Sequence, residues 1–214
     1  MRLHHLPGSR STRVLWTLEE LGIDYDLHVM TGAERTGPEH RALHPLGRVP
    51  VLELDDGRHV FESAAICLHL ADLHPDAGLA PPVGTSDRAA LYQWLFFAMA
   101  ELEPAVFGWM RATRGGTLQE VEAAAQHFAT VAAVLRDVVS ERRWMLGDTF
   151  TVADVLCSGP LGTAYRRGLA DEDGPLREYV ERAAARPANV RAESVRHPGA
   201  ASARTTMPRG SRTR

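Results

Sequence analysis

The strongest constraint on the fold is a proline at the start of a short apolar strand. Residues 44–54 read HPLGRVPVLEL, with Pro50 at the mouth of the apolar run. A proline in this place cannot donate a ladder hydrogen bond, and the peptide bond before it can be cis. The backbone of Val49 is therefore open to pair with an extended peptide, as in strand addition.

A second motif follows at 62–66, ESAAI, where a helix is predicted to begin. The first N–H groups of a helix have no partner inside it, and they suit a carboxylate. Glu62 and Ser63 lie at this point. Together with segment 44–54, they predict a cradle for a short anionic peptide.

The 214 residues are enough for one large domain or two small ones, each with a buried core. No apolar run approaches the roughly 20 residues that cross a bilayer, and the N-terminus lacks the pattern of a secretion signal. Cys67 and Cys157 are the only cysteines, they form no CxxC pair, and both fall in apolar helical patterns. We therefore expect two core thiols, neither a disulfide nor a zinc site, no membrane partner and a cytoplasmic location.

All 24 basic residues are arginine, which excludes mechanisms that need a lysine, such as P-loop and Schiff-base chemistry. Five of these arginines and no acidic residue lie in 196–214, so the preceding part is more acidic than the net charge of −3 indicates. An acidic body does not attract nucleic acid, and the basic end lacks interleaved aromatic residues. We expect no nucleic-acid partner and interpret 194–214 as a disordered tail.

Apolar periodicity divides the chain into two domains, 1–76 and 87–193. The linker between them, 77–86, is rich in proline, glycine and alanine. The second domain shows only helical periodicity. In the first domain the predicted elements are a strand at 3–6, a helix ending at 21, a strand at 25–30, a loop with a weak helix at 31–43, a hairpin of strands 50–54 and 59–61, and a helix at 63–73.

Within the second domain, the sequence FTVADV at 150–155 predicts the start of a helix. Thr151 would cap the backbone N–H of Asp154, whose side chain would reach back, while Phe150 would pack on Val155. Such a cap contributes on the order of 1 kcal/mol, and its role is structural.

Taken in this order, the motifs resemble those of the glutathione transferases. The resemblance spans 1–193 and rests on the SRS motif at 9–11, on 45–50, on 62–63 and on 150–154. It implies an α/β thioredoxin-like domain with a mixed four-stranded sheet, followed by an all-α helical-bundle domain, as in bacterial members of the serine type. It also implies a homodimer that uses glutathione as a co-substrate and needs no metal.

The same resemblance implies how glutathione is held. Val49 would pair its backbone with the cysteinyl part, ahead of a cis Pro50. Glu62 and Ser63 would hold the γ-glutamyl end, and Arg48 would contact the glycyl carboxylate or the backbone around it. The predicted binding residues are Arg10, Arg48, Val49, Pro50, Glu62 and Ser63.

The chemistry needs a thiolate at neutral pH, and lowering a thiol pKa of about 8.5 by two units takes roughly 2.7 kcal/mol. A hydroxyl donating to the sulfur contributes ~1.5–3 kcal/mol, and a helix N-terminus adds ~0.3–1 kcal/mol. No tyrosine precedes Tyr25, and Arg10 stands where cysteine-type members carry their nucleophile. Ser9 is therefore the first catalytic candidate and Ser11 the second, although either serine could merely cap the helix. Arg13 is either a surface residue or a further cation near the sulfur.

The histidine pairs have less specific patterns. His40 and His44 are spaced like metal ligands on a helix, but no glutamate follows His40 and Pro45 ends the helix, so we expect no metal and solvated loop histidines. Of His4 and His5, one ring would face the core or the cleft and the other would face solvent.

Phe97, Glu101 and Trp109, from an aromatic-rich stretch, are the candidates for a second-substrate pocket. The expected function is transfer of the glutathione thiolate to small electrophiles, as in detoxification. Two alternatives remain at this point. One is a non-catalytic binding or chaperone module on the same fold, and the other is a glutathione-dependent reductase of disulfides or peroxides.

Overall fold

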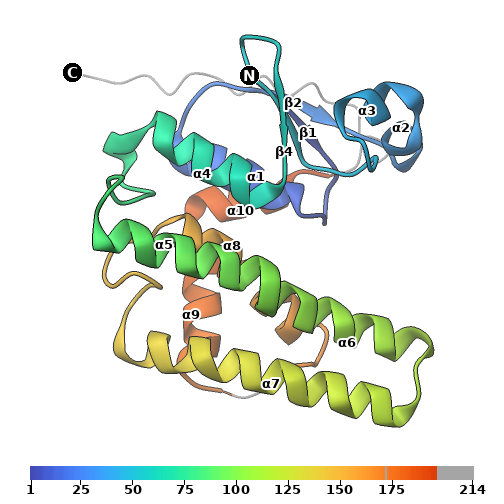
Figure 1. Ribbon diagram of the computed structural model, residues 1–214, viewed down its shortest axis with the longest axis vertical. Coiled ribbons are helices and arrows are strands. Elements are labelled where there is room, and N and C mark those ends of the chain that lie inside the picture. The colour runs from blue at the N-terminus through green and yellow to red at the C-terminus, as the bar shows by residue number, and fades with distance from the viewer. Residues whose placement is uncertain (172, 197–214) are drawn as a thin grey trace.

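A four-stranded mixed sheet forms the centre of the first domain (Figure 1). The computed structural model describes residues 1–171 and 173–196. The strands are β1 (Arg2–His5), β2 (Asp26–Val29), β3 (Val51–Glu53) and β4 (His59–Phe61). Their order is β2-β1-β3-β4, in which β1 and β2 run parallel while β3 is antiparallel to β1 and β4. The mixed sheet expected from the sequence is confirmed.

Two long helices, α1 (Ser11–Leu21) and α4 (Ser63–Leu73), pack together against this sheet. Their apolar faces and the sheet bury Leu3, Leu15 and Ile66 completely. Helix α1 ends at Gly22, whose φ of 62° is left-handed and favours glycine. The bounds of α4 are those predicted from the sequence.

Between β2 and β3 lie two short helices, α2 (Gly32–Thr36) and α3 (Pro38–Leu43), so the prediction of a loop with one weak helix is wrong. Thr31 caps α2, because its side chain accepts from the Glu34 N–H and the Glu34 carboxylate accepts from the Thr31 N–H. Pro38 opens α3, where its missing N–H costs nothing. The local capping signals were present, but both helices are too short for apolar periodicity to reveal them.

The second domain is helical, and Figure 1 shows α5 and α6 forming one long rod that lies along α7. A π-helical turn, η2 (Ala98–Leu102), joins the two parts of the rod. A short 3-10 turn, η1 (Pro75–Ala77), precedes this domain, and residues 78–85 form neither helix nor strand. The helices are α5 (Ser86–Phe97), α6 (Glu103–Gly115), α7 (Leu118–Glu141), α8 (Val152–Arg166), α9 (Pro175–Ala184) and α10 (Pro187–Ser194).

The chain returns to the first domain through α10, which packs against α1. Arg186, just before α10, donates to both carboxylate oxygens of Glu20 on α1, at 2.6 and 2.7 Å. Its guanidinium also lies 3.8 Å from the centre of the Phe150 ring. The two domains therefore share one continuous core with polar ties at its edges.

The cap expected at the start of α8 is confirmed. The Asp154 carboxylate accepts from the N–H groups of Thr151 at 2.9 Å and Met145 at 2.8 Å, and from the Tyr179 hydroxyl at 3.1 Å. Asp154 is fully buried, and burial raises the pKa of its carboxyl to about 6. The group ties α8, α9 and the preceding loop together, which is a structural role.

Cys67 and Cys157 are both free and fully buried, as expected. Burial raises the pKa of the Cys67 thiol to about 11 and that of Cys157 further still, so both stay protonated. Among the residues described, no helix is long and apolar enough to cross a membrane. Of the predicted tail at 194–214, Ser194 closes α10, while 197–214 lie outside the described residues.

Candidate functional site

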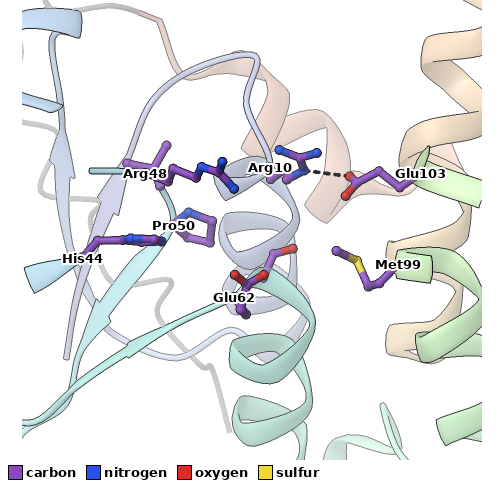
Figure 2. Close-up of a pocket in the computed structure, with 9 residues that line it drawn as sticks. Arg10, His44, Arg48, Pro50, Glu62, Met99 and Glu103 are labelled. Atoms are coloured by element: carbon purple, nitrogen blue, oxygen red, sulfur yellow. Dashed lines mark hydrogen bonds and ion pairs between the residues drawn. The ribbon is translucent and has the colours of Figure 1, made fainter. Parts of the chain in front are cut away.

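A cavity of about 150 Å³ lies between the two domains. The first domain contributes one wall and the helical domain contributes Met99 and Glu103. In Figure 2 these two side chains lie opposite Arg48 and Pro50, with Glu62 between them. The lining residues are Arg10, His44, Arg48, Val49, Pro50, Glu62, Ser63, Met99 and Glu103.

Every residue in the predicted glutathione-binding set lines this cavity. The peptide bond between Val49 and Pro50 is cis, as expected. Strand β3 begins only at Val51, so Val49 lies beyond the ladder that joins β1 to β3. Its backbone therefore reaches the cavity at the open end of a sheet strand.

Glu62 and Ser63 present the N-terminus of α4 to the cavity. Glu62 has a φ of 74°, which is rare for a residue with a side chain and costs on the order of 1–3 kcal/mol. Ser63 is buried, and its hydroxyl accepts a long hydrogen bond of 3.4 Å from Nη1 of Arg13. The backbone thus holds a polar pair at a helix start, a place suited to an anion.

A buried ion cluster closes the cavity on the side of the helical domain. Oε1 of Glu103 accepts from Nη2 of Arg13 at 2.6 Å and from Nε of Arg10 at 2.9 Å (Figure 2 shows the second contact). The side chains of Arg13 and Glu103 are only 9% and 6% exposed, so the interpretation of Arg13 as a surface residue is wrong. Sequence reasoning missed Glu103, because no local pattern connects residues 90 positions apart.

The two candidate serines, Ser9 and Ser11, are not among the lining residues. Ser11 is fully buried, and its hydroxyl contacts Nδ1 of His5 at 2.8 Å and the Leu6 N–H at 3.0 Å. Ser9 is half-buried; its Oγ accepts from the Ser11 N–H at 3.2 Å and lies 2.8 Å from the Ser11 Oγ. Ser9 directly precedes Arg10, which does line the cavity.

The histidines are far more buried than expected. Nε2 of His40 donates to the Arg48 carbonyl at 2.7 Å, and Nδ1 of His44 accepts from the Leu46 N–H at 3.1 Å. Both rings are 3% exposed, so the expectation of solvated loop histidines is wrong. Burial also lowers the pKa of His44. Each ring thus helps to hold the loop that carries Arg48 against the domain.

His4 and His5 are likewise both buried, so the expectation that one of them faces solvent is wrong. Nε2 of His4 contacts Glu53 on the neighbouring strand, yet burial outweighs this contact and lowers the pKa of His4. The His40 ring, on α3, lies beside that of His4, with ring centres 5.8 Å apart. The prediction of a loop with a weak helix at 31–43 gave no sign of this contact, so the alternating strand appeared to have a solvent face.

The residues predicted for a second-substrate pocket do not line the cavity. Phe97 packs on the core with its ring 5.5 Å from that of Trp94, Glu101 is exposed and Trp109 is half-buried. Met99 and Glu103, on the same stretch of helix, point into the cavity instead. The assignment of these three residues stays a prediction.

Comparison with known proteins decides the family. The model of the glutathione S-transferase N-terminal domain matches residues 8–73. Over 192 residues the chain is 30% identical to glutathione S-transferase GstA of Escherichia coli O157:H7, a match that covers 87% of this chain and 94% of that one. The chain belongs to the glutathione S-transferase family.

Solved structures of bacterial glutathione transferases share the fold. A glutathione transferase from Methylococcus capsulatus superposes with a TM-score of 0.79 at 29% identity, covering 90% of this chain and 96% of that one. A sphingomonad glutathione S-transferase complexed with glutathione gives a TM-score of 0.79 at 30% identity, covering 90% and 97%. The protein is thus a glutathione transferase with a thioredoxin-like domain and a helical domain.

Proposed function

We propose that the cavity between the domains binds glutathione and activates its thiol for attack on small electrophiles, a detoxifying reaction. The observation that carries the proposal is the gathering of all six predicted binding residues around one cavity. They come from three separate parts of the first domain, and their charges differ in sign. Glutathione has two carboxylates and one ammonium group, so a cavity with both arginine and glutamate side chains is complementary to it.

Each part of the tripeptide has a partner in this arrangement. The backbone of Val49 pairs with the cysteinyl residue, because it lies free of the sheet ladder at the end of β3. The N-terminus of α4 and Ser63 hold the γ-glutamyl carboxylate, while Glu62 attracts the ammonium group. Arg48 attracts the glycyl carboxylate from the opposite end of the cavity.

Ser9 is the proposed donor to the sulfur, which makes the enzyme one of the serine type. Ser11 is fully buried, and its contacts with His5 and Leu6 account for its hydrogen-bonding capacity. Ser9 is more accessible and adjoins Arg10 at the edge of the cavity. Its hydroxyl and the N-terminus of α1 together supply roughly 2–4 kcal/mol toward the thiolate, as much as the required pKa shift takes.

Two features weigh against the alternative functions. A reductase that exchanges disulfides through its own cysteine needs an accessible thiol, yet the only two cysteines are fully buried. A purely structural module has no need of a residue in the strained backbone conformation of Glu62 beside a polar cavity. Both observations favour chemistry on glutathione itself.

The test is the ultraviolet absorbance of the glutathione thiolate in the complex, followed against pH. We expect the thiol to titrate about two units below free glutathione, and Ser9→Ala to raise that midpoint by about one unit. Ser140→Ala, an exposed serine on α7, is the matched control and leaves the midpoint unchanged. A wild-type midpoint equal to that of free glutathione would overturn the proposal.

A parallel assay separates the functions. Retention on immobilised glutathione together with turnover of a chloronitroaromatic electrophile supports the transferase reaction. Retention without turnover, unchanged in Ser9→Ala, would indicate the binding or chaperone module. Turnover restricted to mixed disulfides or hydroperoxides would indicate the reductase.

We also propose that the enzyme is a cytoplasmic homodimer. Leu46 is 63% exposed and Phe96 is 72% exposed. Large apolar side chains gain stability when a partner subunit covers them. Two free buried thiols are in keeping with a reducing compartment. Light scattering after gel filtration tests the dimer, and Phe96→Glu is expected to shift it toward monomer.

A further inference from the structure

The side chains of His5, Ser11 and Ser9, which are not among the lining residues of the cavity, form a continuous line of contacts. Nδ1 of His5, at the end of β1, lies 2.8 Å from the Ser11 hydroxyl, and this hydroxyl lies 2.8 Å from that of Ser9. His5 is 1% exposed and Ser11 is 0% exposed. Water does not compete at the buried His5 and Ser11 end of this line, so the directions of the hydrogen bonds there are set by protein groups.

The number of hydrogens restricts those directions. A hydroxyl has one hydrogen to donate and accepts two hydrogen bonds. Ser11 already accepts from the Leu6 N–H at 3.0 Å, which leaves it one accepting site. Ser9 already accepts from the Ser11 N–H at 3.2 Å.

When Nδ1 of His5 carries a hydrogen, it fills the last accepting site of Ser11. The Ser9 hydroxyl then cannot donate to Ser11, whose own hydrogen points to Ser9 at 2.8 Å or to the Leu6 carbonyl at 3.2 Å. The hydrogen of Ser9 is therefore left over for an acceptor outside the line. In this state the hydrogen bonds among Nδ1 of His5, Ser11 and Ser9 are made without using it.

When Nδ1 lacks a hydrogen, the directions reverse. Ser11 donates to Nδ1, because a buried ring nitrogen without a partner is costly. The free accepting site of Ser11 then attracts the hydrogen of Ser9. Ser11 then competes with a nearby thiolate for the single hydrogen of Ser9, which weakens donation to the sulfur.

We propose that His5 is a positioning residue that acts through Ser11 and keeps the hydroxyl hydrogen of Ser9 available to the sulfur of bound glutathione. This inference rests on the proposed function, in which Ser9 donates to that sulfur. His5 touches neither substrate. It decides which way the donor points, and Ser11 transmits that direction from inside the domain.

The test uses three substitutions of His5 in the full chain, with the thiolate titration as the readout. His5→Asn places an amide N–H close to the position of Nδ1 and keeps the midpoint of wild type. His5→Leu removes the donor and raises the midpoint by about one unit, a tenfold loss of thiolate at neutral pH. His5→Gln is the matched control: it has the same amide, but one methylene further out, and it behaves like His5→Leu.

A double substitution distinguishes an effect on the orientation of the Ser9 hydroxyl from general damage to the fold. If His5 acts through Ser9, then His5→Leu combined with Ser9→Ala raises the midpoint no more than Ser9→Ala does alone. Additive shifts would overturn the inference, and so would a folded His5→Asn variant that behaves like His5→Leu. Circular dichroism and retention on immobilised glutathione establish that each variant is folded.

The outcomes also distinguish this inference from the proposed function. If Ser9→Ala leaves the midpoint where wild type has it, Ser9 is not the donor and the proposed function fails in this respect. If Ser9→Ala raises the midpoint while His5→Leu does not, the proposed function stands and only the role of His5 is refuted.

Discussion

Among the arginine–carboxylate contacts between the domains, Arg13–Glu103 and Arg88–Asp72 differ in how much of the carboxylate reaches water. At the cavity, Arg13 and Glu103 are 9% and 6% exposed, and a second arginine, Arg10, shares the same carboxylate oxygen. At the far end of the interface, Arg88 is 4% exposed, but its partner Asp72 is 40% exposed. A carboxylate that reaches water keeps part of its hydration, whereas Glu103 depends on its two arginines.

The two contacts differ in how well the interface tolerates the loss of the carboxylate. Arg88 also donates to the Pro81 carbonyl at 3.1 Å and lies 4.9 Å from the centre of the Tyr92 ring, so it keeps other partners if Asp72 is lost. Among the residues that the structure describes, the other hydrogen bonds donated by the Arg13 side chain are long, at 3.4 Å to Ser63 and 3.7 Å to Met99. The contact at the cavity is therefore the more fragile one, and it also shapes the proposed glutathione site.

The largest effect is expected for Glu103→Gln. It leaves Arg13 buried beside a neutral amide, which costs about 3–5 kcal/mol of unfolding free energy in comparable buried pairs. Urea unfolding measures this loss, with Glu122→Gln on the exposed face of α7 as the control, expected within ±0.5 kcal/mol. Retention on immobilised glutathione should also weaken, because Arg10 loses its anchor. Equal stability of the two variants would mean that the cluster contributes nothing net.

A smaller effect, dependent on pH, is expected from Asp154, a carboxylate held by N–H groups and a tyrosine hydroxyl rather than by arginine. Burial raises its pKa from 3.8 to about 6, so its folded state favours the neutral form. The stabilisation of the fold that comes from this raised pKa is complete below pH 3.8, and it is lost as the pH rises through 6.

The stability advantage of wild type over Asp154→Asn should therefore fall by about 3 kcal/mol between acid and neutral pH. Urea unfolding of both proteins across this range measures it. An advantage that stays constant would show that the N–H groups balance the effect of burial on the charged carboxylate, and one that grows toward neutral pH would show that they outweigh it.

The smallest effect is expected for Asp72→Asn. The partly hydrated carboxylate contributes about 1 kcal/mol, since Arg88 keeps its carbonyl and ring contacts. The thiolate titration should not change, because this contact lies away from the cavity. If Asp72→Asn destabilises the protein as much as Glu103→Gln, the difference in exposure does not explain the energetics of the interface.

Local signals in the sequence predicted much of this architecture. Helix α4 has the predicted bounds, the cis bond precedes Pro50, and Thr151 and Asp154 form the expected cap. Each depends on residues within a few positions of one another. The six residues predicted for glutathione also meet at one cavity, because their motifs lie at the ends of strands and helices whose arrangement the family shares.

Contacts across long stretches of chain were not predictable in the same way. A surface position was one interpretation of Arg13, because nothing near it in sequence indicates that it pairs with Glu103. His40 and His44 looked solvated because nothing near them in sequence shows that their rings pack beside those of His4 and Phe61. In each case the missing information was which surface another element would cover.

By itself, the sequence determined the two-domain plan, the open strand end at Val49, the polar helix start at Glu62 and the pair of serines at the start of α1, since each follows from local backbone chemistry. Only the tertiary structure decided that Glu103 would pair with Arg13 and Arg10, and that His5 would stand behind Ser11 and Ser9. Burial and charge pairing depend on which segments come together in space, and that is a property of the folded chain as a whole.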